Sequence, residues 1–176
     1  TQREQERSEL HRTIWNAAND LVHGGAVAPV DFKQYVLVML FYRFISENLA
    51  NYINANEPDK NFDYATLSDK DAEYGRADTV KEKGFYILPS ELFVNVRKNA
   101  RNNPNLNETL FGVFKSIEGS AKGTVSEDDL KGLFEDFNVN STQLGRTVEQ
   151  RNKLLVKLLD TIGDLKLGDY HSNSID

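Results

Sequence analysis

DFKQYVLVMLFYRFISENLANYIN, residues 31–54, is the stretch that decides the fold of this chain, and it contains neither glycine nor proline. Between positions 35 and 45, Arg43 is the only residue that is neither apolar nor aromatic. A helix that is apolar on every side has to lie in the centre of a domain, because it offers no face to water. With Asp31 suited to cap its first turn, the stretch predicts a central helix from about Phe32 to Asn54 that other elements must surround.

The segments available to surround this helix are mostly helical in pattern. Apolar side chains recur at helical spacing near 4–23, 90–101, 107–117, 126–137 and 147–162. Ser90, Asn107 and Ser126 are the expected N-caps, and Gly163 is expected to close the last helix. The inward-facing stripes of these helices are expected to include Phe111 and Val148.

The region between the central helix and the later helices has a different pattern. Residues 55–83 are polar and are expected to be irregular, with a short helix near 69–77. GFYIL (84–88) has the β-branched and aromatic content of a short strand. The sequence therefore predicts a mainly all-α, compact, bundle-like domain with at most one short strand pair near 84–88.

Composition narrows the class of protein. The chain has 176 residues, the size of one domain or slightly more, and no cysteine, which excludes disulfides and zinc–thiolate sites. Its longest apolar run, 35–42, is far shorter than the ~20 residues that a membrane helix needs. The opening TQREQERSEL is charged, unlike a signal peptide. We therefore expect a cytoplasmic domain without membrane contact.

Every partial match to a metal-binding or cofactor-binding motif in this sequence lacks an essential residue. Asp136, Asn138 and Asn140 match the first ligand positions of an EF-hand loop, but Ser141 replaces its glycine and Thr147 its bidentate glutamate. No glycine pattern matches a phosphate-binding or dinucleotide-binding loop. The histidines share no ligand spacing: His11, His23 and His171. We expect no catalytic residue, cofactor site or metal site in this chain.

Charge is distributed in blocks of alternating sign. The net charge of −6 argues against DNA binding over the whole surface. Residues 57–83 carry a net charge of −3 and residues 127–136 one of −4, whereas 97–122 and 146–157 each carry +3. Each block by itself is explained by a solvated helix face, so a basic interface requires that the two basic blocks meet in space.

The opening motifs resemble a known family. WNAANDL (15–21) precedes a short loop and then the central helix, whose pattern continues through Phe41 to Ser46. This arrangement resembles the N-terminal helical domain of the modification (M) subunits of type I restriction–modification systems. GFYILPSELF and LGRTVEQRNKLLVKLLDTIGDLKL are similar to later, looser segments of that family. The resemblance covers about 8–168, although 101–145 match none of the family's patterns.

The resemblance implies a larger parent enzyme. Such an enzyme is an adenine-N6 DNA methyltransferase whose catalytic domain uses S-adenosylmethionine and follows the helical domain. We then expect residues 1–168 to form the helical domain and 169–176 to be a linker toward a catalytic domain that this chain lacks. The implied partners are DNA, the specificity subunit, a second M subunit and the restriction subunit.

Two roles follow for the domain itself. In the first, it helps to enclose DNA and to assemble with the specificity subunit, and phosphates are contacted by Arg97, Lys98, Arg101, Lys115, Arg146, Arg151, Lys153 and Lys157. In the second, it is a protein-interaction scaffold without DNA contact, with Trp15 as an anchor; a core position for Trp15 is the alternative. An autonomous helical protein of unrelated function is the third reading.

Overall fold

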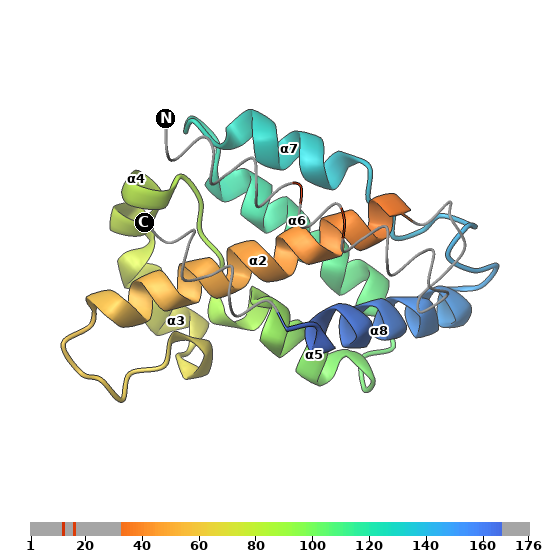
Figure 1. Cartoon of the computed structure of the whole chain (residues 1–176), viewed down its shortest axis with the longest axis horizontal. Helices are drawn as coiled ribbons and strands as arrows, with labels where there is room; N and C mark the ends of the chain where they lie inside the picture. The colour runs from red at the N-terminus through yellow and green to blue at the C-terminus, as the bar shows by residue number, and fades with distance from the viewer. Residues whose placement is uncertain (1–11, 13–15, 17–32, 167–176) are drawn as a thin grey trace.

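The computed structural model describes residues 33–166 together with Arg12 and Asn16 (Figure 1). Trp15, the expected cap Asp31, the three histidines and the tail 169–176 lie outside the described residues. In chain order the elements are α2 (Lys33–Asn56), η2 (Tyr64–Thr66), α3 (Asp69–Ala72), η3 (Glu73–Gly75), α4 (Arg76–Lys83), η4 (Pro89–Glu91), α5 (Phe93–Ala100), α6 (Leu106–Ser120), α7 (Glu127–Glu135) and α8 (Val148–Asp164). The prediction of a mainly all-α domain is confirmed.

The central position of α2 is also confirmed. In Figure 1, α2 crosses the middle of the molecule, with α7 above it and α5 and α8 below it. Both α5 and α8 pack directly against α2. Its side chains with no exposed surface are Val36, Val38, Met39, Leu40, Tyr42 and Leu49. Of the helices that the structure describes, α2 included, none is long and apolar enough to cross a membrane.

Aromatic rings connect α2 to the helices around it. The Tyr42 ring meets Phe93 of α5 edge to face at 5.4 Å and Phe114 of α6 at 5.2 Å. Phe114 in turn stacks on Phe134 of α7, with ring centroids 4.4 Å apart. The buried Tyr42 hydroxyl donates to the Glu91 carbonyl at 2.5 Å, and burial raises its pKa, so it stays neutral. One α2 side chain thus joins α5 and α6 in a single core.

The strand expected at 84–88 is absent, and that prediction is wrong. These residues run without helix or strand between α4 and η4. The Tyr86 N–H donates to the Ser120 Oγ of α6 at 2.8 Å, so a side chain takes the place of a partner strand. Tyr86 and Ile87 are buried. The aromatic and β-branched residues of this stretch therefore fill the core rather than build a sheet.

Several predicted helix boundaries and faces are also wrong. Ser90 lies in η4, and α5 begins at Phe93, whose N–H donates to the buried Ser46 Oγ of α2 at 3.1 Å. Gly163 lies inside α8 rather than after it. Two side chains expected to face inward are largely exposed: Phe111 at 53% and Val148 at 45%. At the start of α5, a hydrogen bond to a distant element thus overrides the local capping pattern.

A buried asparagine pair joins α6 to α8. Asn107, expected as an N-cap, lies within α6, and its backbone N–H donates to Asn152 Oδ1 of α8 at 3.0 Å. Asn152 Nδ2 donates to the Pro104 carbonyl at 2.9 Å, and Asn107 Nδ2 donates to Asn140 Oδ1 at 3.0 Å. Because both asparagines lie away from water, each hydrogen bond replaces one that water would have made.

Replacing Asn152 should therefore destabilise the domain. Asn152→Ala leaves the Asn107 N–H and the Pro104 carbonyl without partners, and we expect it to lower the free energy of unfolding by about 1–3 kcal/mol. The control is Asn99→Ala in α5, an exposed residue that bonds only the carbonyl of Asn95; it should change stability by less than about 0.5 kcal/mol. Equal effects in urea denaturation would show that the buried pair has no special role.

Candidate nucleic-acid interface

The two basic blocks meet where α5 packs against α8. Arg97 Nε lies 3.1 Å from Asp160 Oδ1, and Arg97 Nη2 lies 2.6 Å from Asp164 Oδ1. Arg101 Nη2 lies 2.5 Å from Asp160 Oδ2. Arg101, the later of the two arginines, contacts only Asp160, whereas the earlier Arg97 also reaches Asp164. The helices α5 and α8 therefore run in opposite directions. We call these four residues the α5–α8 seam.

The seam neutralises part of the basic charge. The hydrogen bond from Arg101, and then that from Arg97, lowers the pKa of Asp160 below its ordinary value. The hydrogen bond to Asp164 is the largest cause of the raised pKa of Arg97. Two of the eight candidate phosphate ligands, Arg97 and Arg101, are therefore paired with carboxylates within the seam itself. A phosphate that approached Arg97 or Arg101 would have to compete with Asp160.

Three exposed lysines flank the seam. Lys157 and Lys153 precede Asp160 by three and seven residues, so they continue its stripe along α8. Lys98 lies three residues before Arg101 on α5. Lys153 Nζ is 3.8 Å from Glu149, in a pair whose two side chains are about four-fifths exposed, and such pairs contribute little. We call Lys98, Lys153 and Lys157, together with Arg97 and Arg101, the α5–α8 basic face.

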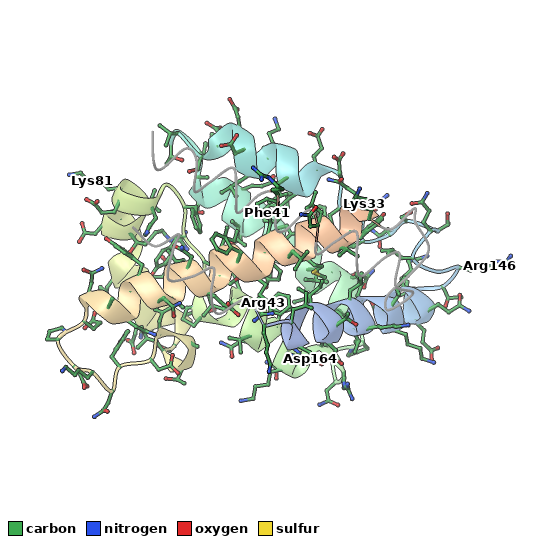
Figure 2. The ribbon with its side chains drawn as sticks, in the orientation of Figure 1. Lys33, Phe41, Arg43, Lys81, Arg146 and Asp164 are labelled. Carbon is green, nitrogen blue, oxygen red and sulfur yellow. The ribbon has the colours of Figure 1, made fainter. Side chains whose placement is uncertain are left out.

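The arginines at the start of α8 differ in their availability. Arg146 is exposed, and Figure 2 shows it at the far end of α8 from Asp164. Arg151 is half-buried, and its Nη1 donates to the Gly145 carbonyl at 3.1 Å. Its Nε is buried without a hydrogen-bond partner among the described residues. Arg151 therefore holds the loop before α8 in place, whereas Arg146 is open to a ligand.

Lys115 lies apart from the basic face. It belongs to α6, where its Nζ stands 5.6 Å from the centre of the Phe111 ring and 3.6 Å from Glu118. It lines a groove between α6 and α7 that also contains Lys131 and Glu135. The structure thus brings together the candidates of α5 and α8 and leaves Lys115 on a different pair of helices.

The side chains of the other partial motifs have structural roles. In the described residues, no three His, Asp or Glu side chains gather closely enough to hold a metal ion. In the loop whose sequence resembles an EF-hand, Asn138 Oδ1 accepts from the Asn140 N–H, and Thr147 Oγ1 caps α8 by accepting from Gln150. The acidic residues of the seam, Asp160 and Asp164, were not singled out from the sequence. Their spacing of three and seven residues after Lys157 was the available signal.

The seam should make Gly163 intolerant of a side chain. A Cβ at Gly163 would clash with Arg97, including a 2.8 Å approach to its Cδ, whereas a Cβ at Gly112 in α6 meets nothing within 4 Å. We expect Gly112→Ala to stabilise the domain by about 0.5–1 kcal/mol through helix propensity. Gly163→Ala should give no such gain, because it displaces Arg97 from its two carboxylates.

A double-mutant cycle isolates the cause of this difference. In an Arg97→Ala background the clash is absent, so Gly163→Ala should recover the stabilisation expected at Gly112. The free energies of unfolding are measured by chemical denaturation. If Gly163→Ala changed the free energy of unfolding equally with and without Arg97, a clash between the new side chain and Arg97 would be contradicted.

The seam also predicts a pH dependence of stability. Because the folded-state pKa of Asp160 is lowered, the unfolded chain binds this proton at a higher pH than the folded chain does. The stabilisation is complete above the ordinary carboxyl range of about pH 4 and is lost as the pH falls through the lowered value. We expect Asp160→Asn to lose stability less steeply on acidification than the unmodified chain.

The control for this measurement is Glu135→Gln, because Glu135 makes no salt bridge with the part of the chain that is described. Its curve of unfolding free energy against pH should run parallel to that of the unmodified chain. If Asp160→Asn also ran parallel, the pairing with Arg97 and Arg101 would not contribute to stability.

Comparison with known proteins gives a consistent result. The chain matches the family described as HsdM N-terminal domain over residues 10–162, a span that includes 101–145. It is 41% identical over 186 residues to the type I restriction enzyme MpnII methylase subunit of Mycoplasma pneumoniae, covering 99% of this chain and 33% of that protein. The chain thus spans about a third of the length of this curated relative.

A solved structure has a similar fold. The type I restriction-modification system methyltransferase subunit from Streptococcus thermophilus superposes with a TM-score of 0.65 at 21% sequence identity. The match covers 96% of this chain and 37% of that one. The family match, the sequence relative and the shared helical fold agree, and the chain belongs to the family of HsdM N-terminal domains of type I restriction–modification methylase subunits.

Proposed function

We propose that this domain is a non-catalytic part of a type I restriction–modification methyltransferase subunit that helps to enclose DNA and to assemble with the specificity subunit. The observation that carries the DNA role is the α5–α8 basic face, where exposed lysines from two chain segments about fifty residues apart lie on adjoining helices. Membership of the family supports the assembly role.

The character of the basic face indicates weak, backbone-directed contact. Lysines bind phosphate as mobile point charges, so they attract DNA without reading its sequence. Asp160 and Asp164 hold Arg97 and Arg101 and reduce the positive charge of the face. Binding of this kind positions DNA, while sequence recognition is left to another subunit.

The chemistry of the parent enzyme belongs outside the described residues. Binding of a nucleotide-like cofactor usually needs a strand, a glycine-rich turn and a helix. Here Gly84, Gly123 and Gly145, the described glycines with positive φ, lie in connections next to helices, and no described element is a strand. The described residues therefore do not fit S-adenosylmethionine. We assign this cofactor and adenine-N6 methylation to the rest of the parent protein.

The proposed assembly includes further partners. They are a specificity subunit, a second methyltransferase subunit and a restriction subunit, and the complex is expected to work in the cytoplasm. Residues 1–168 would form the helical domain and 169–176 the connection toward the catalytic domain.

A salt titration tests the DNA contact. We expect this chain to bind a fluorescein-labelled duplex weakly, with an affinity that falls steeply between about 50 and 200 mM salt. The triple variant Lys98→Glu, Lys153→Glu and Lys157→Glu should weaken binding about tenfold or more at the lower salt. It should also flatten the salt dependence by roughly one unit of slope for each phosphate that the variant no longer neutralises. Fluorescence anisotropy measures both the affinity and its salt dependence.

The matched control reverses the same amount of charge elsewhere. Lys60, Lys70 and Lys131 are exposed and lie away from α5 and α8, so reversing them to Glu should have a much smaller effect on DNA affinity. Equal losses from both triple variants would point to net charge alone. Binding that is insensitive to salt would favour a purely protein-interacting domain.

A further inference from the structure

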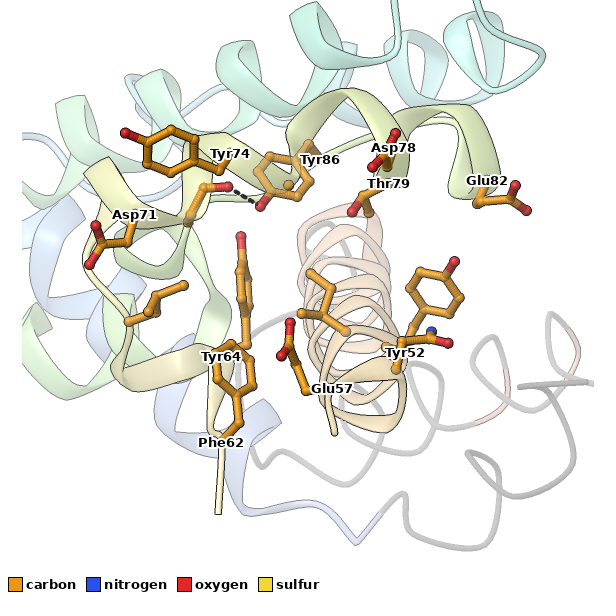
Figure 3. Close-up of a pocket in the computed structure, with 15 residues that line it drawn as sticks. Tyr52, Glu57, Phe62, Tyr64, Asp71, Tyr74, Asp78, Thr79, Glu82 and Tyr86 are labelled. Atoms are coloured by element: carbon orange, nitrogen blue, oxygen red, sulfur yellow. Dashed lines mark hydrogen bonds between the residues drawn. The ribbon is translucent and has the colours of Figure 1, made fainter. Parts of the chain in front are cut away.

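A pocket lies at the C-terminal end of α2, at a distance from the seam. The last turns of α2, the segment around η2 and the short helices α3 and α4 enclose a cavity of about 460 Å³ (Figure 3). From the sequence, this region is expected to be polar and irregular, with a short helix near 69–77. The structure shows instead that its side chains converge on one space.

The walls of the pocket are aromatic. Tyr52 of α2, Phe62, Tyr64 and Tyr86 line it. The Tyr64 hydroxyl donates to the Ile87 carbonyl at 2.7 Å, and the Tyr86 hydroxyl donates to the Ala72 carbonyl at 2.5 Å. Both hydroxyl protons are therefore used within the fold. The two rings are thereby held in fixed positions in the inner wall of the pocket, where they also contact each other at 6.2 Å between centroids.

The charged side chains that line the pocket are all acidic. Its acidic side chains are all exposed, and none forms a salt bridge with a described residue: Glu57, Asp71, Asp78 and Glu82. No Lys or Arg is among the described residues that line it. The 24-residue α2 ends here with no basic residue in its last turn, so the negative end of its dipole adds to the same potential.

Thr79, a largely buried residue inside the pocket, has a hydroxyl without a hydrogen-bond partner among the described residues, although its oxygen keeps some contact with solvent. Thr79 of α4 lines the cavity and is only 8% exposed. Figure 3 shows its side chain directed toward the space between α4 and the end of α2. No hydrogen bond joins its Oγ1 to the part of the chain that the structure describes. A ligand N–H placed in the cavity could donate to this oxygen in place of water.

Two of the aromatic rings already have a cation of the chain itself next to them, so the setting is one in which positive charge is accommodated. Lys83 Nζ lies 4.5 Å from the centre of the Tyr52 ring, and the Arg76 guanidinium carbon lies 5.1 Å from that of Tyr86. Such contacts strengthen as the cation loses water. Aromatic walls, four carboxylates and a hydroxyl acceptor together suit a cationic side chain, whose apolar stem packs on the rings.

We propose that this pocket receives an arginine or lysine side chain of the specificity subunit, a partner that rests on the proposed function. Tyr74 favours a polypeptide as the occupant, because it stands at the rim with 86% of its surface exposed. An exposed tyrosine beside a pocket is a typical anchor for the segment on either side of an inserted residue. DNA is disfavoured here, because the carboxylates repel phosphate. The site serves assembly whether or not the α5–α8 basic face contacts DNA.

The first test uses small probes. Nα-acetyl-arginine amide is titrated into the ¹⁵N-labelled chain, with Nα-acetyl-citrulline amide as a neutral probe of nearly the same shape. We expect arginine to shift the amide signals of Tyr52, Gly75 and Thr79, and citrulline to leave them nearly unchanged. Equal shifts with the two probes, or arginine shifts spread over the whole surface, would overturn the proposal.

Variants then locate the binding. Asp78→Asn with Glu82→Gln should weaken arginine binding roughly threefold or more. Thr79→Val, which keeps the shape and removes the hydroxyl, should also weaken it about threefold or more. The control is Asp128→Asn with Asp129→Asn at the start of α7, which removes the same charge outside the pocket. If the control weakened arginine binding as much as the pocket variants do, the binding would depend on net charge alone and the pocket would not be the site.

The second test addresses the partner. In the full-length parent protein, Tyr74→Ala and the Asp78–Glu82 double variant should each weaken assembly with the specificity subunit about threefold or more, as measured by titration calorimetry, and the Asp128–Asp129 control should not. Unchanged assembly in the pocket variants would overturn the partner assignment, even if the chain alone binds arginine. Because this readout contains no DNA, it is independent of the salt titration of the α5–α8 basic face.

Discussion

The burial of most of the apolar surface of α2 is the constraint on which the rest of the structure depends. Its apolar residues leave no face for water, so α5 and α8 pack on it directly and α6 joins through the Tyr42–Phe114 contact. Arg43, the charged residue in the middle of α2, also contributes to the packing of the helices. Figure 2 shows Arg43 directed toward the end of α8, and its Nη1 donates to the carbonyls of Ile162 and Leu165. That contact stabilises the C-terminal end of α8 and fixes α8 against α2.

This fixed arrangement gives the domain two chemically opposite regions. The pairing of α5 with α8 aligns lysines beside the seam, whereas the end of α2 collects carboxylates and aromatic rings around Thr79. Neither region could be recognised from the net charge of −6 alone. Under the two proposed roles, the domain meets phosphates with one surface and a basic protein segment with another, because the opposite charges lie on different elements of one core.

The helical part of the fold was predictable because its signals are local. The all-round apolar pattern of α2 and the apolar spacing near 147–162 depend on residues within one or two turns, and the helices that they predict are present. The failures involve distant partners. GFYIL looks like a strand, but the Ser120 side chain satisfies its backbone. Asn107 looks like a cap, but Asn152, forty-five residues later, binds its N–H.

The sequence by itself determined that the chain is a helical domain built on one buried helix, and that its basic and acidic residues occur in blocks, because periodicity and composition are properties of neighbouring residues. Only the tertiary structure decided what those blocks do. It paired Arg97 and Arg101 with Asp160, set Lys115 apart, and gathered tyrosines from distant segments around one cavity. Charge and aromatic contacts act over a few ångströms in space, and the residues that make them lie tens of positions apart along the chain.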